Sequence, residues 1–223
     1  MGSGGRAAGH GLSVVLRCSL RFDFRNSSVG GMPASETEPR VPPLEAPFAT
    51  DVGRLLERMM PPGLPPIALF RMFAHNPPMA EAMHGWGSYE LSRRLSVPMR
   101  TRELVIDRVT ARLGCEYEWG VHVAFFAERV ALTSEQVRSL THGSPEDPCW
   151  EDEDRSVLRL VDSLLERADV DDGLWKELAC HFSDAQMLDM LVLAGWYHAI
   201  AFTAKAARVP LEEGTPRFAD YAA

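Results

Sequence analysis

The residues best suited to chemistry lie between Glu103 and His122, in a stretch that reads E-L-V-I-D-R-V-T-A-R-L-G-C-E-Y-E-W-G-V-H. Within it, Cys115, Glu118 and His122 stand at positions i, i+3 and i+7. On a helix this spacing places all three side chains on one stripe, where they can meet. A thiol, an acid and a base could therefore share one pocket.

These residue types suggest two kinds of reaction. Cys115 follows Gly114 at an expected helix start, where the positive end of the helix dipole lowers the pKa of a thiol and favours the thiolate that attacks peroxides. His122 could donate or accept a proton, with Glu118 orienting its ring. Glu103 lies on the preceding expected helix, and a fold-back at Gly114 would bring this second carboxylate to the same pocket.

Each candidate also has a structural interpretation. A cysteine at a helix start is more often a packed hydrophobe than a nucleophile, and Glu118 with His122 could be only a surface pair. Tyr117, Trp119 and His198 are the candidate substrate-binding residues, although aromatics and histidines on apolar faces more often belong to a core. Two ligands one turn apart do not hold a metal, so no metal site is expected.

The composition excludes several classes of partner. The 223 residues carry a formal net charge of −8, which argues against nucleic acid and anionic membranes, because both require a basic surface. No run approaches the roughly 18 consecutive apolar residues of a membrane span. The four cysteines match no disulfide framework or zinc pattern, so we expect a reducing, cytoplasmic location.

The chain divides near residue 46. Residues 1–46 are expected to form a disordered or extended tail, because paired glycines come first and a segment rich in proline and acid follows. Met32 is an alternative start of the protein. Residues 47–223 are expected to form one helical domain.

Helical periodicity and capping signals predict an all-α fold, and no alternating segment reads as a strand. Two segments fit the capping box, one starting at Thr133 and one at Ser183. The expected helices, in chain order, are 52–60, 67–73, one starting at Asn76, one opened by Pro98 and ending before Gly114, 115–130, one starting at Thr133, one containing 157–165 and ended by the acidic turn 169–172, and 184–208.

The last of these helices carries a second histidine on an apolar stripe. The stripe consists of Leu188, Leu191, Gly195, His198 and Phe202. Two helix-rich halves, each with a histidine on an apolar face, could enclose one pocket.

The pattern R-x-R-E-L-V-I-x-R-V followed by G-C-E-Y-E-W-G-V-H resembles the carboxymuconolactone decarboxylase and alkylhydroperoxidase D-like superfamily. The resemblance runs from about Pro47 to Gly214 and includes the closing G-W-Y-H-A-I-A-F. It implies an all-α, alkylhydroperoxidase D-like helical bundle that acts on a small-molecule substrate without a cofactor. It also implies assembly into homo-oligomers, trimers or hexamers, with Trp86, Trp119 and Trp196 as possible interface residues.

The redox branch of that superfamily carries a glutamate, then C-x-x-C, then a histidine four residues later. Glu103, Cys115 and His122 match three of these positions, and Glu118 stands where the second cysteine would be. The dithiol–disulfide cycle of that branch cannot run without the partner thiol. A one-cysteine peroxidase, resolved by an outside thiol or a distant cysteine, is one hypothesis for this chain.

The decarboxylase branch shows E-x-x-x-H, which Glu118 and His122 match. The leading hypothesis is therefore acid–base decarboxylation, isomerisation or a related lyase step on a small cyclic carboxylate or lactone, with His122 as proton donor. The substrate carboxylate would need a cation, and three arginines are near in sequence: Arg102, Arg108 and Arg112. A third hypothesis is a helical oligomer that binds a small molecule without turning it over.

Overall fold

A computed structural model describes residues 38–222, and these form nine α-helices, two short 3-10 helices and no strand. The predicted all-α class is confirmed for this part of the chain. The elements are α1 (Thr50–Met59), α2 (Ala68–Phe73), α3 (Pro77–Glu90), α4 (Met99–Arg112), α5 (Glu116–Phe126), η1 (Glu128–Val130), α6 (Ser134–His142), α7 (Asp152–Arg167), α8 (Asp172–Leu178), α9 (Asp184–Ala207) and η2 (Phe218–Tyr221).

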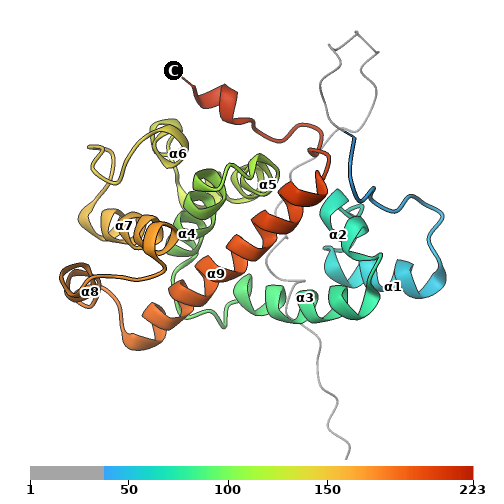
Figure 1. The fold of residues 1–223 in the computed structure, drawn as a ribbon, viewed down its shortest axis with the longest axis horizontal. Coiled ribbons are helices and arrows are strands. Elements are labelled where there is room, and N and C mark those ends of the chain that lie inside the picture. Colours follow the sequence, from blue (N-terminus) through green and yellow to red (C-terminus); the bar gives the residue numbers. More distant parts are fainter. Residues whose placement is uncertain (1–37, 223) are drawn as a thin grey trace, which may run out of the picture. The chain divides into compact units, whose positions relative to one another are not determined.

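The helices group into two compact units (Figure 1). One unit contains residues 43–92 and therefore α1, α2 and α3, which pack on one another. The other contains residues 93–223 with residues 40–42, and it holds α4 to α9. Residues 38–46 form no helix or strand, and the rest of the expected tail lies outside the described residues.

Local signals placed most helix ends correctly. The Asn76 side chain accepts a hydrogen bond from the backbone of Met79 at 3.3 Å, and Thr133 forms its capping box with Gln136. Gly114 lies between α4 and α5 with φ +64°, a left-handed conformation that suits glycine and turns the chain sharply. The two helices carrying the candidate residues thus form a hairpin.

Helix α4 is the centre of the larger unit. It packs against α5, α6, α7 and α9, and every residue from Thr101 to Thr110 is buried. Because the helix is surrounded, its charged residues are buried along with its apolar ones. Each of these charges needs compensation inside the protein.

Two elements differ from expectation. Helix α8 was missed: the acidic turn that closes α7 also opens a new helix, because Asp171 caps it by accepting from the backbone of Gly173 and Leu174, both at 3.0 Å. The helix expected over 115–130 ends at Phe126 and continues as the 3-10 turn η1. Short helices and their breaks carry little periodicity from which to predict them.

The stripe chosen on α9 is also wrong in its facing. Leu188 and Phe202 are each 62% exposed, whereas the buried face carries Met190, Leu193 and Tyr197. Because α9 is apolar on all sides, periodicity could not identify its inner face. By length and composition alone α9 could cross a membrane, which is weak evidence, and in this structure it packs against α4 and α5.

We expect the core of the larger unit to depend on Arg108. Its buried guanidinium pairs with Asp162 at 2.7 Å and donates to the carbonyls of Ser139, Leu140 and Gly143 near the end of α6. Arg108→Ala should lower the free energy of unfolding by about 3 kcal/mol or more, because it leaves these acceptors unpaired.

The matched control is Arg159, which also forms a 2.7 Å ion pair but is much more exposed. Arg159→Ala should cost less than about 1 kcal/mol. Chemical denaturation of both variants measures the difference, and equal losses would contradict the importance assigned to Arg108.

Candidate functional site

The site begins with a buried ion pair between α4 and α5. Nδ1 of His122 lies 2.8 Å from Oε2 of Glu103, and the Glu103 side chain has no exposed surface. The turn at Gly114 brings the two helices together, as the sequence suggested. The contact gives the imidazole a fixed orientation and a carboxylate partner.

A second cation holds the other oxygen of Glu103. Nε of Arg102 donates to Oε1 of Glu103 at 2.6 Å. The Arg102 guanidinium also lies 4.9 Å from the centre of the Phe126 ring, and Phe126 stacks on His122 with the ring centres 5.4 Å apart. The glutamate is thereby fixed between two positive groups and an aromatic wall.

Helix α9 contributes a partner that sequence reasoning missed. The Tyr197 hydroxyl lies 3.0 Å from Nε2 of His122, and the Tyr197 ring meets the imidazole edge-on. A series of side-chain contacts therefore joins three helices. It runs from Arg102 to Glu103 on α4, then to His122 on α5 and Tyr197 on α9. The available signal was the G-W-Y-H segment, in which Tyr197 stands next to the candidate residue His198.

Two carboxyl groups border this chain with an oxygen that has no partner among the described residues. Oε1 of Glu118 is 3.7 Å from Nε2 of His122, while its buried Oε2 has no hydrogen bond. Oδ1 of Asp107 is also buried without one. A buried acceptor without a donor is costly, so these two atoms mark where a ligand or a proton could be taken up.

The charges settle the protonation of the imidazole. Burial alone lowers the pKa of His122, but the Glu103 carboxylate and then Glu118 outweigh it and raise the pKa to about 10. At neutral pH His122 is an imidazolium, and both ring nitrogens donate. It can therefore act as a proton donor at neutral pH rather than as a base.

Cys115 lacks the properties expected of a peroxidatic thiol. It is the residue before α5 and is fully buried. Burial raises its pKa to about 12, and the nearby Lys205 does not offset that rise. The helix dipole was expected to lower the pKa of Cys115, but burial has the larger effect. The free energy needed to remove a thiolate from water exceeds the stabilisation that the dipole gives it.

The three candidate substrate-binding residues lie outside the chain of contacts around His122. The Tyr117 hydroxyl donates to Glu212 at 2.6 Å. Trp119 is fully buried and packs on aromatic rings of η2, in agreement with its interpretation as a core residue. His198 is half-buried, and its ring meets the exposed Phe202 edge-on.

Of the three arginines near the motif, only Arg102 belongs to the site. Arg108 and Arg112 both pair with Asp162 on α7, at 2.7 and 3.4 Å. Arg102 itself is engaged with Glu103, so its guanidinium supports the dyad. Among the described residues, no group of three or more His, Cys, Asp or Glu side chains could hold a metal ion.

Asp107 provides a test of the electrostatics. Burial, with a smaller effect from Glu103, raises its pKa well above 3.8. The folded protein therefore holds a proton that the unfolded chain releases, and the associated stability, full below about pH 4, is lost as pH rises through the folded pKa. Asp107→Asn should remove this loss, so its stability relative to wild type should increase with pH.

Urea denaturation of both proteins between pH 4 and 9 checks this expectation. Asp152→Asn, at an exposed position in the first turn of α7, controls for the loss of one negative charge. If the free energies of unfolding of Asp107→Asn and wild type differed by the same amount across the pH range, the expectation would be contradicted.

Comparison with known proteins adds a fold and a family similarity over part of the chain. Residues 77–146 match the carboxymuconolactone decarboxylase family. A search of curated proteins gave no match.

Several solved structures share the fold at low identity. An uncharacterised peroxidase-related protein from Silicibacter sp. TM1040 aligns with a TM-score of 0.65 and 16% identity, over 82% of this chain and all of that one. A protein of unknown function from Agrobacterium tumefaciens, proposed to be the antioxidant defence protein AhpD, aligns with a TM-score of 0.57 and 20% identity. The alignment covers 63% of this chain and 94% of that one. A cysteine-to-alanine variant of the debrominase Bmp8, in complex with 2,3,4-tribromopyrrole, aligns with a TM-score of 0.61 and 17% identity. The alignment covers 80% of this chain and 95% of that one.

The family match covers the turn from α4 into α5 that carries Glu103, Glu118 and His122. The similar structures agree with the helical architecture around it. Over residues 77–146 this chain is thus similar to the carboxymuconolactone decarboxylase family, and its helical fold is similar to that of the solved structures above.

Proposed function

We propose that this protein is a cofactor-independent acid–base enzyme that acts on a small cyclic carboxylate or lactone, by decarboxylation, isomerisation or a related lyase step. The observation that carries the proposal is the buried chain from Glu103 through His122 to Tyr197. It maintains an imidazolium at neutral pH and directs its second N–H to a hydroxyl group. Such an arrangement suits proton delivery to a carbanion.

For a decarboxylation the step would run as follows. The bond between the ring carbon and the carboxylate breaks, carbon dioxide leaves, and the electron pair stays on the substrate as a dienolate. The Tyr197 hydroxyl donates its proton to that carbon, and Nε2–H of His122 replaces the proton on the tyrosine oxygen. Glu103 stabilises the imidazolium before transfer, and a proton from solvent restores it.

Glu118 would face the substrate in this scheme. Its free Oε2 is a buried acceptor beside His122 and can bind a hydroxyl or N–H group of a ring. The complex of a debrominase of similar fold with a small halogenated pyrrole supports a ligand of that size. We also propose a cytoplasmic location, consistent with the fold and with cysteines that form no disulfide among the described residues.

Peroxide reduction by one cysteine receives less support. Cys115 is fully buried and its pKa is raised to about 12, so at neutral pH almost no thiolate is present. A hydrogen bond from the Glu118 backbone lowers the pKa of Cys115, but the Glu118 carboxylate, at the position of the resolving cysteine, raises it. The same substitution that removes the dithiol thus also opposes formation of the remaining thiolate.

The decisive test compares His122→Gln with Cys115→Ser on a panel of small lactone carboxylic acids in deuterated water. Carbon dioxide release and deuterium at the product carbon report the reaction. His122→Gln should lose at least about 100-fold in kcat, since proton transfer by a positioned acid contributes roughly 100- to 10,000-fold. Cys115→Ser should keep most activity.

Wild-type activity should be level at neutral pH and fall as pH rises through about 10, where His122 loses its proton. An active His122→Gln enzyme would sink the proposal. Rapid oxidation of Cys115 by hydrogen peroxide in the native protein, followed by peptide mass mapping, would favour the peroxidase instead. Saturable binding with no product from any panel member would favour a non-catalytic binding protein.

A second prediction separates Tyr197 from a merely structural tyrosine. Tyr197→Phe removes the hydroxyl that contacts His122, and hydrogen bonds to charged groups contribute about 1.5–3 kcal/mol. Because this hydroxyl is also the group that donates its proton to carbon in the proposed step, we expect kcat to fall at least about 100-fold. Tyr117→Phe loses a hydroxyl bonded to Glu212 and is the matched control. Equal kcat values for the two variants would remove Tyr197 from the mechanism.

A further inference from the structure

Helix α9 carries an unbroken apolar stripe on the face opposite Tyr197. All seven of its positions are exposed, and they follow one another at alternating steps of three and four residues, the spacing of a helix–helix seam. We call it the outer stripe of α9. It consists of Ala185, Leu188, Val192, Gly195, Ala199, Phe202 and Ala206.

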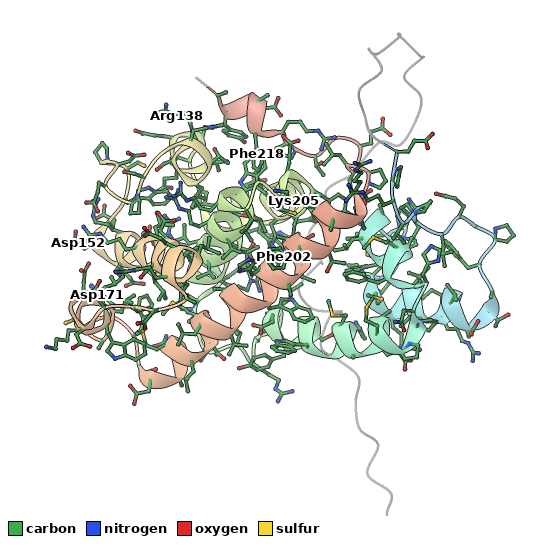
Figure 2. The ribbon with its side chains drawn as sticks, viewed as in Figure 1. Arg138, Asp152, Asp171, Phe202, Lys205 and Phe218 are labelled. Atoms are coloured by element: carbon green, nitrogen blue, oxygen red, sulfur yellow. The ribbon has the colours of Figure 1, made fainter. Side chains whose placement is uncertain are left out.

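The large members of the outer stripe are unusually exposed. Leu188 and Phe202 are 62% exposed and Val192 is 45% exposed. The stripe covers 22 residues, or roughly 32 Å of helix at 1.5 Å per residue. Phe202 marks its second half in Figure 2, with Lys205 one turn further along α9. A continuous apolar face of this length typically marks an interaction site.

The stripe is arranged about its own centre. Gly195 is its middle member, and a Cβ built there meets nothing within 4 Å. If two copies of α9 cross antiparallel at Gly195, Leu188 of each lies against Phe202 of the other, and Val192 lies against Ala199. The small central residue lets the backbones approach, as at tightly packed helix crossings.

Charge selects the antiparallel direction. Asp184 precedes the stripe, Arg208 follows it, and residues 190–204 contain no Asp, Glu, Lys or Arg. Parallel helices would place Asp184 beside Asp184, whereas antiparallel helices place the acidic start of one beside the basic end of the other. The uncharged middle and the net charge of −8 also disfavour a lipid surface, because interfacial helices use basic residues on their polar face.

We propose that the outer stripe of α9 binds the same stripe of a second copy of this chain, in an antiparallel, twofold contact centred on Gly195. Such an interface is self-complementary, as closed dimers require. The same contact can join the halves of a larger assembly with twofold axes. The proposal does not depend on the proposed reaction, because Tyr197 faces the opposite side of the helix.

The test is sedimentation of the full chain over a range of concentrations, comparing wild type with Gly195→Leu. The new side chain enters open space in the single chain, and replacing a helical glycine favours folding by up to about 1 kcal/mol. In the pair it forces the helices apart. We expect wild type to assemble and Gly195→Leu to raise the dissociation constant by about tenfold or more.

Gly85→Leu is the matched control, because Gly85 is also exposed, helical and free of neighbours within 4 Å of its Cβ. It should assemble like wild type. Asp184→Arg should weaken assembly, and adding Arg208→Asp should restore it, since the two charges are then exchanged.

Three results would overturn the proposal. The full chain could stay monomeric at all concentrations, or Gly195→Leu could assemble as tightly as wild type. The third is co-flotation of the wild-type protein with phosphatidylcholine vesicles that increases in Gly195→Leu, which would make lipid the occupant of the stripe.

Discussion

The contact on which the site depends is the buried pair of Glu103 and His122. A carboxylate without exposed surface is tolerated only when positive groups and hydrogen-bond donors surround it. Here Arg102 and His122 each hold one of its oxygens. The same interaction raises the pKa of His122, because the negative charge of the buried Glu103 stabilises the imidazolium.

This balance links folding to chemistry. The folded pKa of His122 lies above its ordinary value of 6.5, so the pair contributes stability that is complete below about pH 6.5 and is lost as pH rises through about 10. Asp107 acts in the same direction, since burial raises the pKa of its carboxyl well above 3.8. The site therefore retains protons that the unfolded chain would release at neutral pH, which is the condition an acid catalyst requires.

Local rules in the sequence were sufficient for the hairpin that brings Glu103 to His122. Gly114 required a turn, and the i to i+4 spacing put Glu118 and His122 on one face. The fate of Cys115 could not be predicted in the same way. Its position at a helix start was correct, but its pKa depends on how completely neighbouring elements bury it, and no local pattern contains that information.

The contact of Tyr197 with His122 could not be predicted from the sequence for a related reason. Adjacent residues on a helix point about 100° apart, so choosing the inner one requires knowing which face is buried. In α7 the polar and apolar faces are distinct: of the predicted stripe Val157, Val161, Leu164 and Leu165, the two valines are buried and the two leucines are partly buried. In α9 apolar residues lie on every side, and only the packing against α4 and α5 distinguishes them.

An all-round apolar helix is itself informative when only one side of it is buried. The inner face of α9 is accounted for by Tyr197, Leu193 and the other residues that close the core. The outer face has no such role within the described chain, yet it avoids charge for fifteen residues, from 190 to 204. Exposure of Leu188 and Phe202 to water brings no gain in folding free energy. A helix with a core on one side and an apolar seam on the other can connect two subunits while its buried tyrosine remains fixed against His122.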